Sequence, residues 1–427
     1  MKTKILNFIN KFQQYFKIDF FYLIKGGSWL TAGRLINVFA AFLLSLAWAN
    51  WIDKETFGNY QYILSLVGII SIFSLPEMDT AVTQAVARKF EGSFIRGFKV
   101  QLKWGILGSL SALFIAGYYW IQNNQNLSSC FLIVALFLPL FNASLIYLGL
   151  LTGRKLFDIQ VKYDAITQLI ATAIMILTLF FIKEFLLGVP IYIILCLIIF
   201  IYFLSRTLLR TFFLVITNLK FKPNKKEDTK TIGFGIKLSF SGIIDSLTGN
   251  LDKILLFHYL GAIDLAIYSF AKLVPEQIRF FLIRPINLMS LPNFSVRSQK
   301  ELKKTIFKKI YYWTVLISIF VLIYILLAPF VFQIFFPKYL SAVPYSQLYA
   351  LSIIPLSFPI IGNIFKAKMM LKQIYQLKII PSIIRAGLFL ILIPLFGIWG
   401  AILGVVLARI FNAFFISILF KTTNKEN

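Results

Sequence analysis

The feature that most constrains this chain of 427 residues is a series of twelve apolar stretches, each about long enough to cross a lipid bilayer as a helix. Inside the hydrocarbon core, only helices and closed barrels satisfy all of their own backbone hydrogen bonds. We therefore expect an all-α, polytopic membrane protein. The predicted transmembrane helices cover residues 26–50, 57–87, 104–121, 129–151, 163–182, 188–214, 232–257, 264–293, 310–332, 343–365, 378–395 and 398–420.

The composition excludes the main alternative, a water-soluble enzyme. Hydrophobic residues make up 59% of the chain and charged residues only 14%, whereas a soluble protein carries about 25% charged residues. The mean hydropathy of +0.81 points the same way. A soluble core could not bury this much apolar surface, and the predicted helices leave no stretch for a separate soluble domain.

The basic residues are distributed very unevenly between the two sides of the predicted helices. Of the 43 Lys and Arg residues, 32 lie in the two termini and in the loops on the same side, including seven between 206 and 231. The opposite loops carry only Lys54, Lys183 and Lys338. Because basic loops stay in the cytoplasm, we expect both termini to be cytoplasmic and the protein to reside in the cell (inner or plasma) membrane. The net charge of +26 then reflects topology and affinity for anionic lipids, and we expect no nucleic-acid partner.

A polar segment near the midpoint divides the chain into two halves, and the halves show a weak internal repeat. We expect two six-helix bundles, over 26–214 and 232–420, joined by a cytoplasmic linker over 215–231. Six is an even number, so both bundles start from the same side. A parallel repeat of this kind is expected to enclose a central cavity suited to alternating access. The remaining parts are a basic, amphipathic segment over 1–25 and a cytoplasmic tail over 421–427.

Ionisable residues inside the predicted helices are the candidates for function, because a charge in the membrane is costly and usually faces protein or a water-filled cavity. Eight cations and six acids occur there, and the surplus of cations predicts an anionic substrate, such as the pyrophosphate or acidic sugars of a lipid-linked molecule. The candidate substrate-binding residues are Arg34, Lys272, Arg279, Arg284, Arg385 and Arg409. The candidate ion-coupling residues are Glu77, Asp79, Asp245 and Glu276.

A structural interpretation of some of these charges stays open. Lys272, Glu276 and Arg279 are spaced so that they share one face of a helix. Glu276 could pair with Lys272 or Arg279, and Asp252 with a neighbour.

Other kinds of site find little support in the sequence. The only histidine, His258, is expected to be a polar residue at a helix end, and Cys130 and Cys196 are expected to be small core residues. No metal cluster, ATP-binding loop or dinucleotide fingerprint is present, so we expect no metal and no cofactor. The outer loops are short, which argues against a membrane enzyme. Active transport would depend on an ion gradient or on removal of the substrate.

Two segments resemble bacterial polysaccharide flippases, the O-antigen or capsule repeat-unit transporters of the multidrug/oligosaccharidyl-lipid/polysaccharide exporter superfamily. In the second half, Asn250-Leu251-Asp252-Lys253, then Leu260-Gly261 and Ile267-Tyr268-Ser269-Phe270-Ala271, are similar to the family's seventh and eighth helices. Ala266 stands where the family usually has Gly. In the first half the similar segments are Gly26-Gly27-Ser28-Trp29, Phe57-Gly58-Asn59-Tyr60, Glu77-Met78-Asp79-Thr80-Ala81 and Ala87-Arg88.

The resemblance implies a transporter that turns an undecaprenyl-pyrophosphate-linked oligosaccharide from the cytoplasmic to the outer leaflet during surface polysaccharide biosynthesis. The expected partners are that substrate, membrane lipids and other polysaccharide assembly proteins, with the protein itself a monomer. Two relatives are alternatives: an ion-coupled multidrug or cation antiporter, which would use membrane carboxylates, and a lipid II flippase, which typically carries two further C-terminal helices. A membrane scaffold of a polysaccharide assembly complex is a third alternative.

Overall fold

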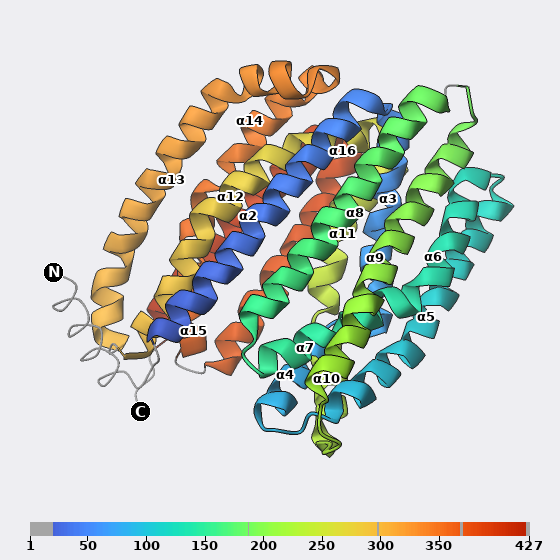
Figure 1. Cartoon of the computed structure of the whole chain (residues 1–427). Helices are drawn as coiled ribbons and strands as arrows, with labels where there is room; N and C mark the ends of the chain where they lie inside the picture. The colour runs from blue at the N-terminus through green and yellow to red at the C-terminus, as the bar shows by residue number, and fades with distance from the viewer. Residues whose placement is uncertain (1–19, 187, 297–298, 368–369, 424–427) are drawn as a thin grey trace, which may run out of the picture.

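The computed structural model describes residues 20–186, 188–296, 299–367 and 370–423, and within these ranges the chain forms helices and short connections without any strand. The prediction of an all-α, multi-pass membrane protein is confirmed. The first half contains α2 (Phe20–Trp51), α3 (Lys54–Ile70), η1 (Ser71–Ser74), α4 (Met78–Ala87), α5 (Ser93–Ile121), α6 (Gln125–Ala143), η2 (Ser144–Ile146), α7 (Tyr147–Gly153), α8 (Phe157–Phe185) and α9 (Ile191–Phe221) (Figure 1).

The second half follows after the linker and ends with a long, bent helical segment. It contains α10 (Thr229–Ser241), α11 (Ile243–Leu260), α12 (Ala262–Val296), α13 (Gln299–Phe335), η3 (Pro337–Ala342), α14 (Val343–Leu351), η4 (Ile354–Ser357), α15 (Ile360–Ala367) and α16 (Leu371–Thr422). At Gly397 the backbone leaves the helical region, with φ 57° and ψ −129°, so α16 comprises two helices. This break falls between the last two predicted transmembrane helices.

Each predicted span corresponds to helical residues, but several boundaries differ, and the spans predicted over 57–87, 129–151, 232–257 and 343–365 each consist of more than one helix. The third span begins at Ser93 rather than near 104, because its polar first turns stay helical beyond the apolar part. The second span is broken at Leu75–Pro76, where proline cannot donate a backbone hydrogen bond. The buried Gln101 side chain donates to the carbonyl of Leu75 at 2.9 Å and so satisfies an acceptor at this break.

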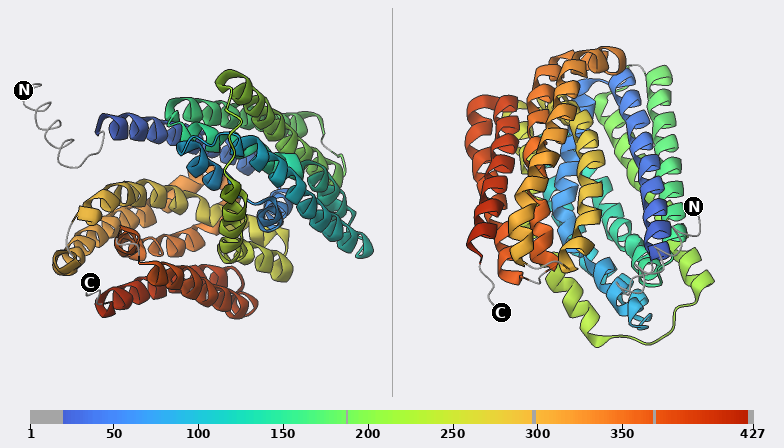
Figure 2. Two further views of the ribbon diagram at one scale, coloured as in Figure 1. Left: turned by 90° about the horizontal axis from the view of Figure 1, so that it is seen from below. Right: turned by 90° about the vertical axis from the view of Figure 1, so that its left-hand side faces the viewer.

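The helices gather into two groups that meet along α3, α11 and α12. Seen from one end, the helices before the linker lie on one side and most of the later helices on the other (Figure 2). Within the first group α2 packs on α8 and α6 on α5 and α9, and within the second α16 packs on α11 and α14. Contacts of α3 with α11 and α12 join the groups. The helix α10 follows the linker but packs against α4 and α5 of the first group, and the division into two bundles of six remains a prediction.

The linker between the halves is attached to the loop that follows α4. Both carboxylate oxygens of Glu91 accept hydrogen bonds from Arg154, at 2.7 and 2.6 Å, and Glu91 also accepts from the backbone nitrogen of Asn224 at 2.9 Å. The backbone nitrogen of Gly92 donates to the carbonyl of Lys226 at 2.8 Å. This carboxylate therefore holds the linker against the first group of helices.

We expect acid to weaken this attachment. Hydrogen bonding from Arg154 holds the pKa of Glu91 below its ordinary value. A carboxyl group with a lowered pKa contributes stability above its unfolded pKa of about 4.3, and the contribution is lost as the pH falls through the lowered value. Hydrogen exchange, corrected for intrinsic rates, should therefore show protection of the amides of Gly92 and Asn224 at neutral pH that falls below about pH 4. In Glu91→Gln the protection of these two amides should be weak both at neutral pH and below about pH 4. If the variant lost as much protection in acid as the wild type does, the Glu91 carboxylate would not be the group that holds the linker.

Candidate functional site

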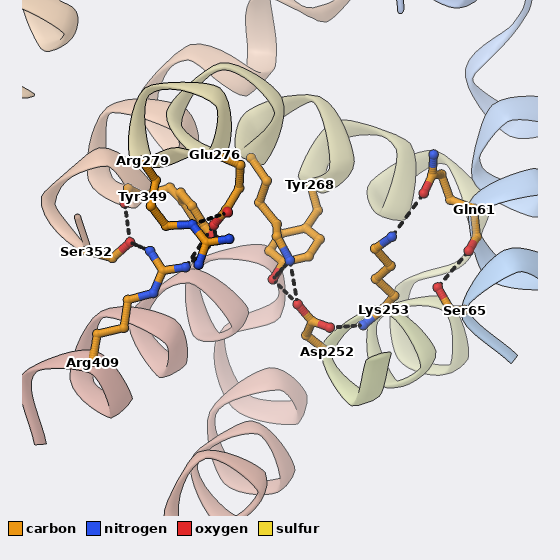
Figure 3. A network of polar contacts seen from close by, with 11 residues as sticks. Gln61, Ser65, Asp252, Lys253, Tyr268, Glu276, Arg279, Tyr349, Ser352 and Arg409 are labelled. Atoms are coloured by element: carbon orange, nitrogen blue, oxygen red, sulfur yellow. Dashed lines mark hydrogen bonds and ion pairs between the residues drawn. The ribbon is translucent and has the colours of Figure 1, made fainter. Parts of the chain in front are cut away.

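A network of charged side chains lies among α11, α12, α14 and α16 of the second half (Figure 3). At its centre Glu276, on α12, accepts hydrogen bonds from two guanidinium groups. Arg279 donates from Nε at 2.6 Å and Arg409, on α16, from Nη2 at 2.8 Å. The hydroxyl of Tyr349, on α14, also donates to Glu276, and Arg409 Nη1 donates to Ser352 Oγ at 2.7 Å. One carboxylate therefore joins three helices.

A second carboxylate, that of Asp252 on α11, is fully buried beside the first. It accepts from the hydroxyl of Tyr268 at 2.5 Å and from Lys272 Nζ at 2.7 Å. The next residue, Lys253, points toward the first half and donates to Gln61 Oε1 on α3 at 3.0 Å (Figure 3). The network thus reaches the boundary between the two groups of helices.

Cations outnumber acids in this network. Glu276 is shared by Arg279 and Arg409, Asp252 pairs with Lys272, and the Lys253 ammonium donates to the side-chain amide of Gln61. Arg385, on α16, lies within electrostatic range of Asp252, and its Nε is buried without a hydrogen-bond partner among the described residues. Its guanidinium lies 5.1 Å from the ring centre of Phe389. Five cations therefore face two acids.

The structure brings four of the six candidate substrate-binding residues together. Lys272, Arg279, Arg385 and Arg409 lie together, and Arg279 is the most accessible of the salt-bridged cations in it, with 45% of its side chain exposed. The pairing of Glu276 with Arg279, one of the two structural alternatives, is present, whereas Lys272 pairs with Asp252 instead. The side chains of the other two predicted residues, Arg34 and Arg284, lie outside the part of the structure that is described.

The candidate ion-coupling residues do not lie together. Asp245, at the start of α11, is exposed and accepts from Ser382 Oγ at 3.3 Å. Glu77 and Asp79 lie at the start of α4, where both accept hydrogen bonds from Thr80. Acids at the start of a helix interact favourably with its dipole and its free N–H groups, and the ion-coupling role of this pair stays a prediction. Glu276 belongs to the cationic network.

A cavity of about 420 Å³ lies between the two groups of helices. Its polar lining consists of Asn37 on α2, Gln160 and Asp164 on α8, and Gln277 on α12, and Asn37 Nδ2 donates to Asp164 Oδ2 at 3.0 Å. Gln277 follows Glu276 directly in the chain, so α12 contributes to both the cavity and the charged network. The rest of the lining is formed by Gly33, Val38, Ala41, Leu148, Val161 and Phe280.

The sequence analysis missed several polar residues that the structure brings inside. Arg206 and Arg210 were counted with the basic residues between 206 and 231, although they also fall within the helix predicted over 188–214; in the structure α9 continues to Phe221, with Arg206 buried and Arg210 partly buried. Their guanidinium groups lie 4.0 and 4.4 Å from the ring centres of Tyr202 and Phe141. Arg210 also donates to the carbonyl of Phe141, close to the break before η2, at 3.2 Å. Their place inside the helix predicted over 188–214 is the signal that could have added them to the candidates.

The remaining predictions concern residues outside the network. Cys130 is buried, as expected, but the structure also places its sulfur 3.6 Å from that of Cys196, across α6 and α9. His258 is exposed near the end of α11, beside Tyr259. The described residues contain no group of three or more potential metal ligands.

The arrangement of helices is similar to that of several solved membrane transporters. The inward-facing structure of a multidrug resistance MATE family transporter of the MOP superfamily matches with a TM-score of 0.65 at 13% identity, covering 92% of this chain and 96% of that one. The lipid II flippase MurJ in an inward closed conformation matches with a TM-score of 0.69 at 15% identity, covering 93% and 88%. A MOP superfamily transporter from Pyrococcus furiosus matches with a TM-score of 0.55 at 13% identity, covering 95% of each chain. At such identities the likeness shows the fold.

The sequence identifies the family within this fold class. A family model described as polysaccharide biosynthesis protein matches residues 23–296, well over half of the chain. The chain belongs to this family, and the resemblance found in the sequence is confirmed. No curated protein sequence matches the chain.

Proposed function

We propose that this protein flips an undecaprenyl-pyrophosphate-linked oligosaccharide from the cytoplasmic to the outer leaflet by alternating access, for the synthesis of a surface polysaccharide such as O-antigen or capsule. Membership of the polysaccharide biosynthesis family supports the pathway, and the fold of MOP superfamily transporters supports transport rather than an enzymatic reaction. The proposed location is the inner or plasma membrane, with both termini in the cytoplasm.

The observation that carries the proposal is the surplus of cations in the network. Five cations share two carboxylates, so the network can accept further negative charge without first losing its own ion pairs. Arg279 is the contact we assign to the pyrophosphate, because only its Nε is used by Glu276. Its two terminal nitrogens form no hydrogen bond with described residues and could bind two phosphate oxygens at once.

Two groups of helices that meet mainly along α3 suit an alternating-access transporter. We propose that residues 26–214 and 232–420 move as two bundles around the cavity, joined by the linker over 215–231. The contact between α10 and α4 then belongs to the state described here. When the bundles move, either this contact breaks or α10 moves together with α4.

A second function, ion-coupled export of organic cations, is favoured by one observation. The only ionisable residue among those that line the cavity in the described structure is an acid, Asp164. A carboxylate in such a place would attract a cationic drug. The cationic network beside the cavity favours the anionic substrate, and the two functions differ in what accumulates when the gene is removed.

Deleting the gene and restoring it as Arg279→Ala tests the proposal. We expect the deletion strain to accumulate lipid-linked repeat units on the cytoplasmic side, and the wild-type gene to remove them. Arg279→Ala should lower the rate of surface polysaccharide formation by about tenfold or more, the effect of losing one charge-assisted bidentate contact. Arg279→Lys should fall between the two, because lysine keeps the charge but not the planar fork.

The control for this experiment is Lys183→Ala, which removes a cation at the exposed end of α8, where its side chain is 45% exposed beside Glu184. It should leave polysaccharide formation unchanged. A deletion strain with normal polysaccharide but increased sensitivity to cationic drugs would instead establish the second function.

A further inference from the structure

We propose that the cavity between α2, α7, α8 and α12 binds the sugar next to the pyrophosphate, and that it selects an uncharged sugar over an acidic one. This inference rests on the proposed function, because it assigns one part of the lipid-linked substrate to this cavity. The cavity volume of about 420 Å³ lies within the range of about 300–1,000 Å³ that is usual for small-molecule sites.

The polar lining of the cavity offers unused hydrogen-bonding groups of both kinds. Asn37 Oδ1 is buried and accepts no hydrogen bond within the described residues. Gln160 Oε1 accepts from Thr152 Oγ1 at 2.9 Å, which leaves its NH₂ group as a donor. Gln277 forms no side-chain hydrogen bond in the described part of the chain. Sugar hydroxyls both donate and accept, so they match a mixture of amides and a carboxylate.

The apolar lining suits the C–H face of a sugar ring. Phe280, one turn from Gln277 on the same helix, lines the cavity together with Val38 and Val161. One pyranose can use both kinds of lining. The amides bind the hydroxyl groups at the edge of its ring, and the aromatic side chain covers the face of the ring. The same mixture would leave a bare phosphate without a cation among the described lining residues.

The position of α12 joins this cavity to the cationic network. Glu276 and Arg279 lie on the face of α12 that meets Arg409, and Gln277 and Phe280 follow each of them by one residue. One residue along a helix is a rotation of about 100°. A head group lying across α12 can therefore place its pyrophosphate at Arg279 and its first sugar in the cavity.

The charge of the cavity decides which sugars it accepts. Asp164 is the only ionisable residue among the described residues that line it. Its carboxylate is exposed and can accept from hydroxyl or N–H groups of a neutral sugar, but it repels the carboxylate of a uronic acid held close to it. The sequence analysis expected the cationic residues to bind either the pyrophosphate or acidic sugars. In this proposal the cationic residues bind the pyrophosphate alone, and the cavity binds a neutral sugar.

Binding measurements on the purified full chain in lipid nanodiscs test this inference. Three probes are compared: undecaprenyl pyrophosphate alone, the same lipid carrying N-acetylglucosamine, and the same lipid carrying glucuronic acid. We expect the N-acetylglucosamine probe to bind about tenfold more tightly than the glucuronic acid probe, a difference typical of one satisfied against one repelled polar group. Asp164→Ala should reduce this ratio to near one and leave the affinity for the bare lipid unchanged.

Two further variants make the result decisive. Gln277→Ala removes an amide that no described residue needs, so it should fold normally and weaken only the probes that carry sugar. Asp158→Ala removes an acid from the first turn of the helix that carries Asp164; Asp158 is not among the residues that line the cavity, and the change should alter none of the three affinities.

Equal affinity of the wild type for both sugar probes, or equal weakening of all three probes in Asp164→Ala, would overturn the inference. The inference would also be overturned, in favour of a cation site, by a second pattern. In this pattern the organic cation tetraphenylphosphonium competes with the lipid probes in the wild type but not in Asp164→Ala, and the wild type binds both sugar probes equally. If even undecaprenyl pyrophosphate fails to bind the wild type, the proposed function itself fails.

Discussion

Arg409→Ala is expected to destabilise the protein more than the loss of any exposed cation. The change leaves Glu276, a largely buried carboxylate, with Arg279 as its one cationic partner among the described residues, and it removes the link from α16 to α12 and to Ser352. Breaking a buried ion pair by removing one partner costs about 3–5 kcal/mol. Detergent-solubilised Arg409→Ala should therefore lose its monodisperse peak at a clearly lower temperature than the wild type in size-exclusion chromatography.

A double variant distinguishes two effects of Arg409→Ala: the loss of the partner of the Glu276 charge, and the loss of the Arg409 side chain itself. In the double variant Arg409→Ala/Glu276→Gln the carboxylate that lost its partner is neutral, so much of the lost thermal stability should return. Lys183→Ala, at an exposed ion pair, should stay within about 0.5 kcal/mol of the wild type. If the double variant is no more stable than Arg409→Ala alone, an uncompensated carboxylate is not the cause.

Gly58→Ala is expected to abolish transport by forcing the two groups of helices apart. A Cβ atom at Gly58, on α3, would lie 2.5 Å from the carbonyl carbon of Ala262 and closer still to its oxygen. Because both are backbone atoms at the start of α12, no side-chain rotation relieves the overlap. Overpacking at such a contact costs about 1–3 kcal/mol, and it acts where α3 and α12 join the halves.

The matched control is Gly117→Ala, on α5, where an added Cβ meets nothing within 4 Å. This variant should transport normally and be about 0.5–1 kcal/mol more stable, the usual gain of alanine over glycine in a helix. Ala262→Gly should not rescue Gly58→Ala, since the overlap is with the backbone. Equal polysaccharide formation by Gly58→Ala and Gly117→Ala would contradict the close approach of α3 and α12.

The fold was predictable from the sequence because one physical requirement dominates it. A segment that crosses a bilayer needs about 20 apolar residues. Apolar stretches of that length therefore reveal how many membrane-spanning segments there are and in what order they follow. Helix ends were less predictable, since backbone hydrogen bonding continues into polar residues, as in the first turns of α5. Arg206 and Arg210 were not singled out, because they were counted with the basic residues that follow, although they lie within α9 and within the helix predicted over 188–214.

The candidate site was predictable only where its residues are close in sequence. The spacing of Glu276 and Arg279 on one helix indicated a common face, and the structure joins them. The partners Arg409 and Tyr349 come from other helices, and no local pattern shows which helices will be neighbours. Asp164 was not singled out, because it lies at the polar start of a predicted helix and meets Asn37 only after α2 and α8 pack together.

The most direct test of the central claim is a flipping assay on the purified protein in vesicles. An undecaprenyl-pyrophosphate-linked oligosaccharide with a labelled sugar is placed in both leaflets, and a membrane-impermeant reagent destroys the label that it can reach. The proposed function predicts that the label of the inner leaflet becomes accessible when wild-type protein is present, and stays protected with Arg279→Ala or with empty vesicles. Continued protection in the presence of correctly folded wild-type protein would contradict it.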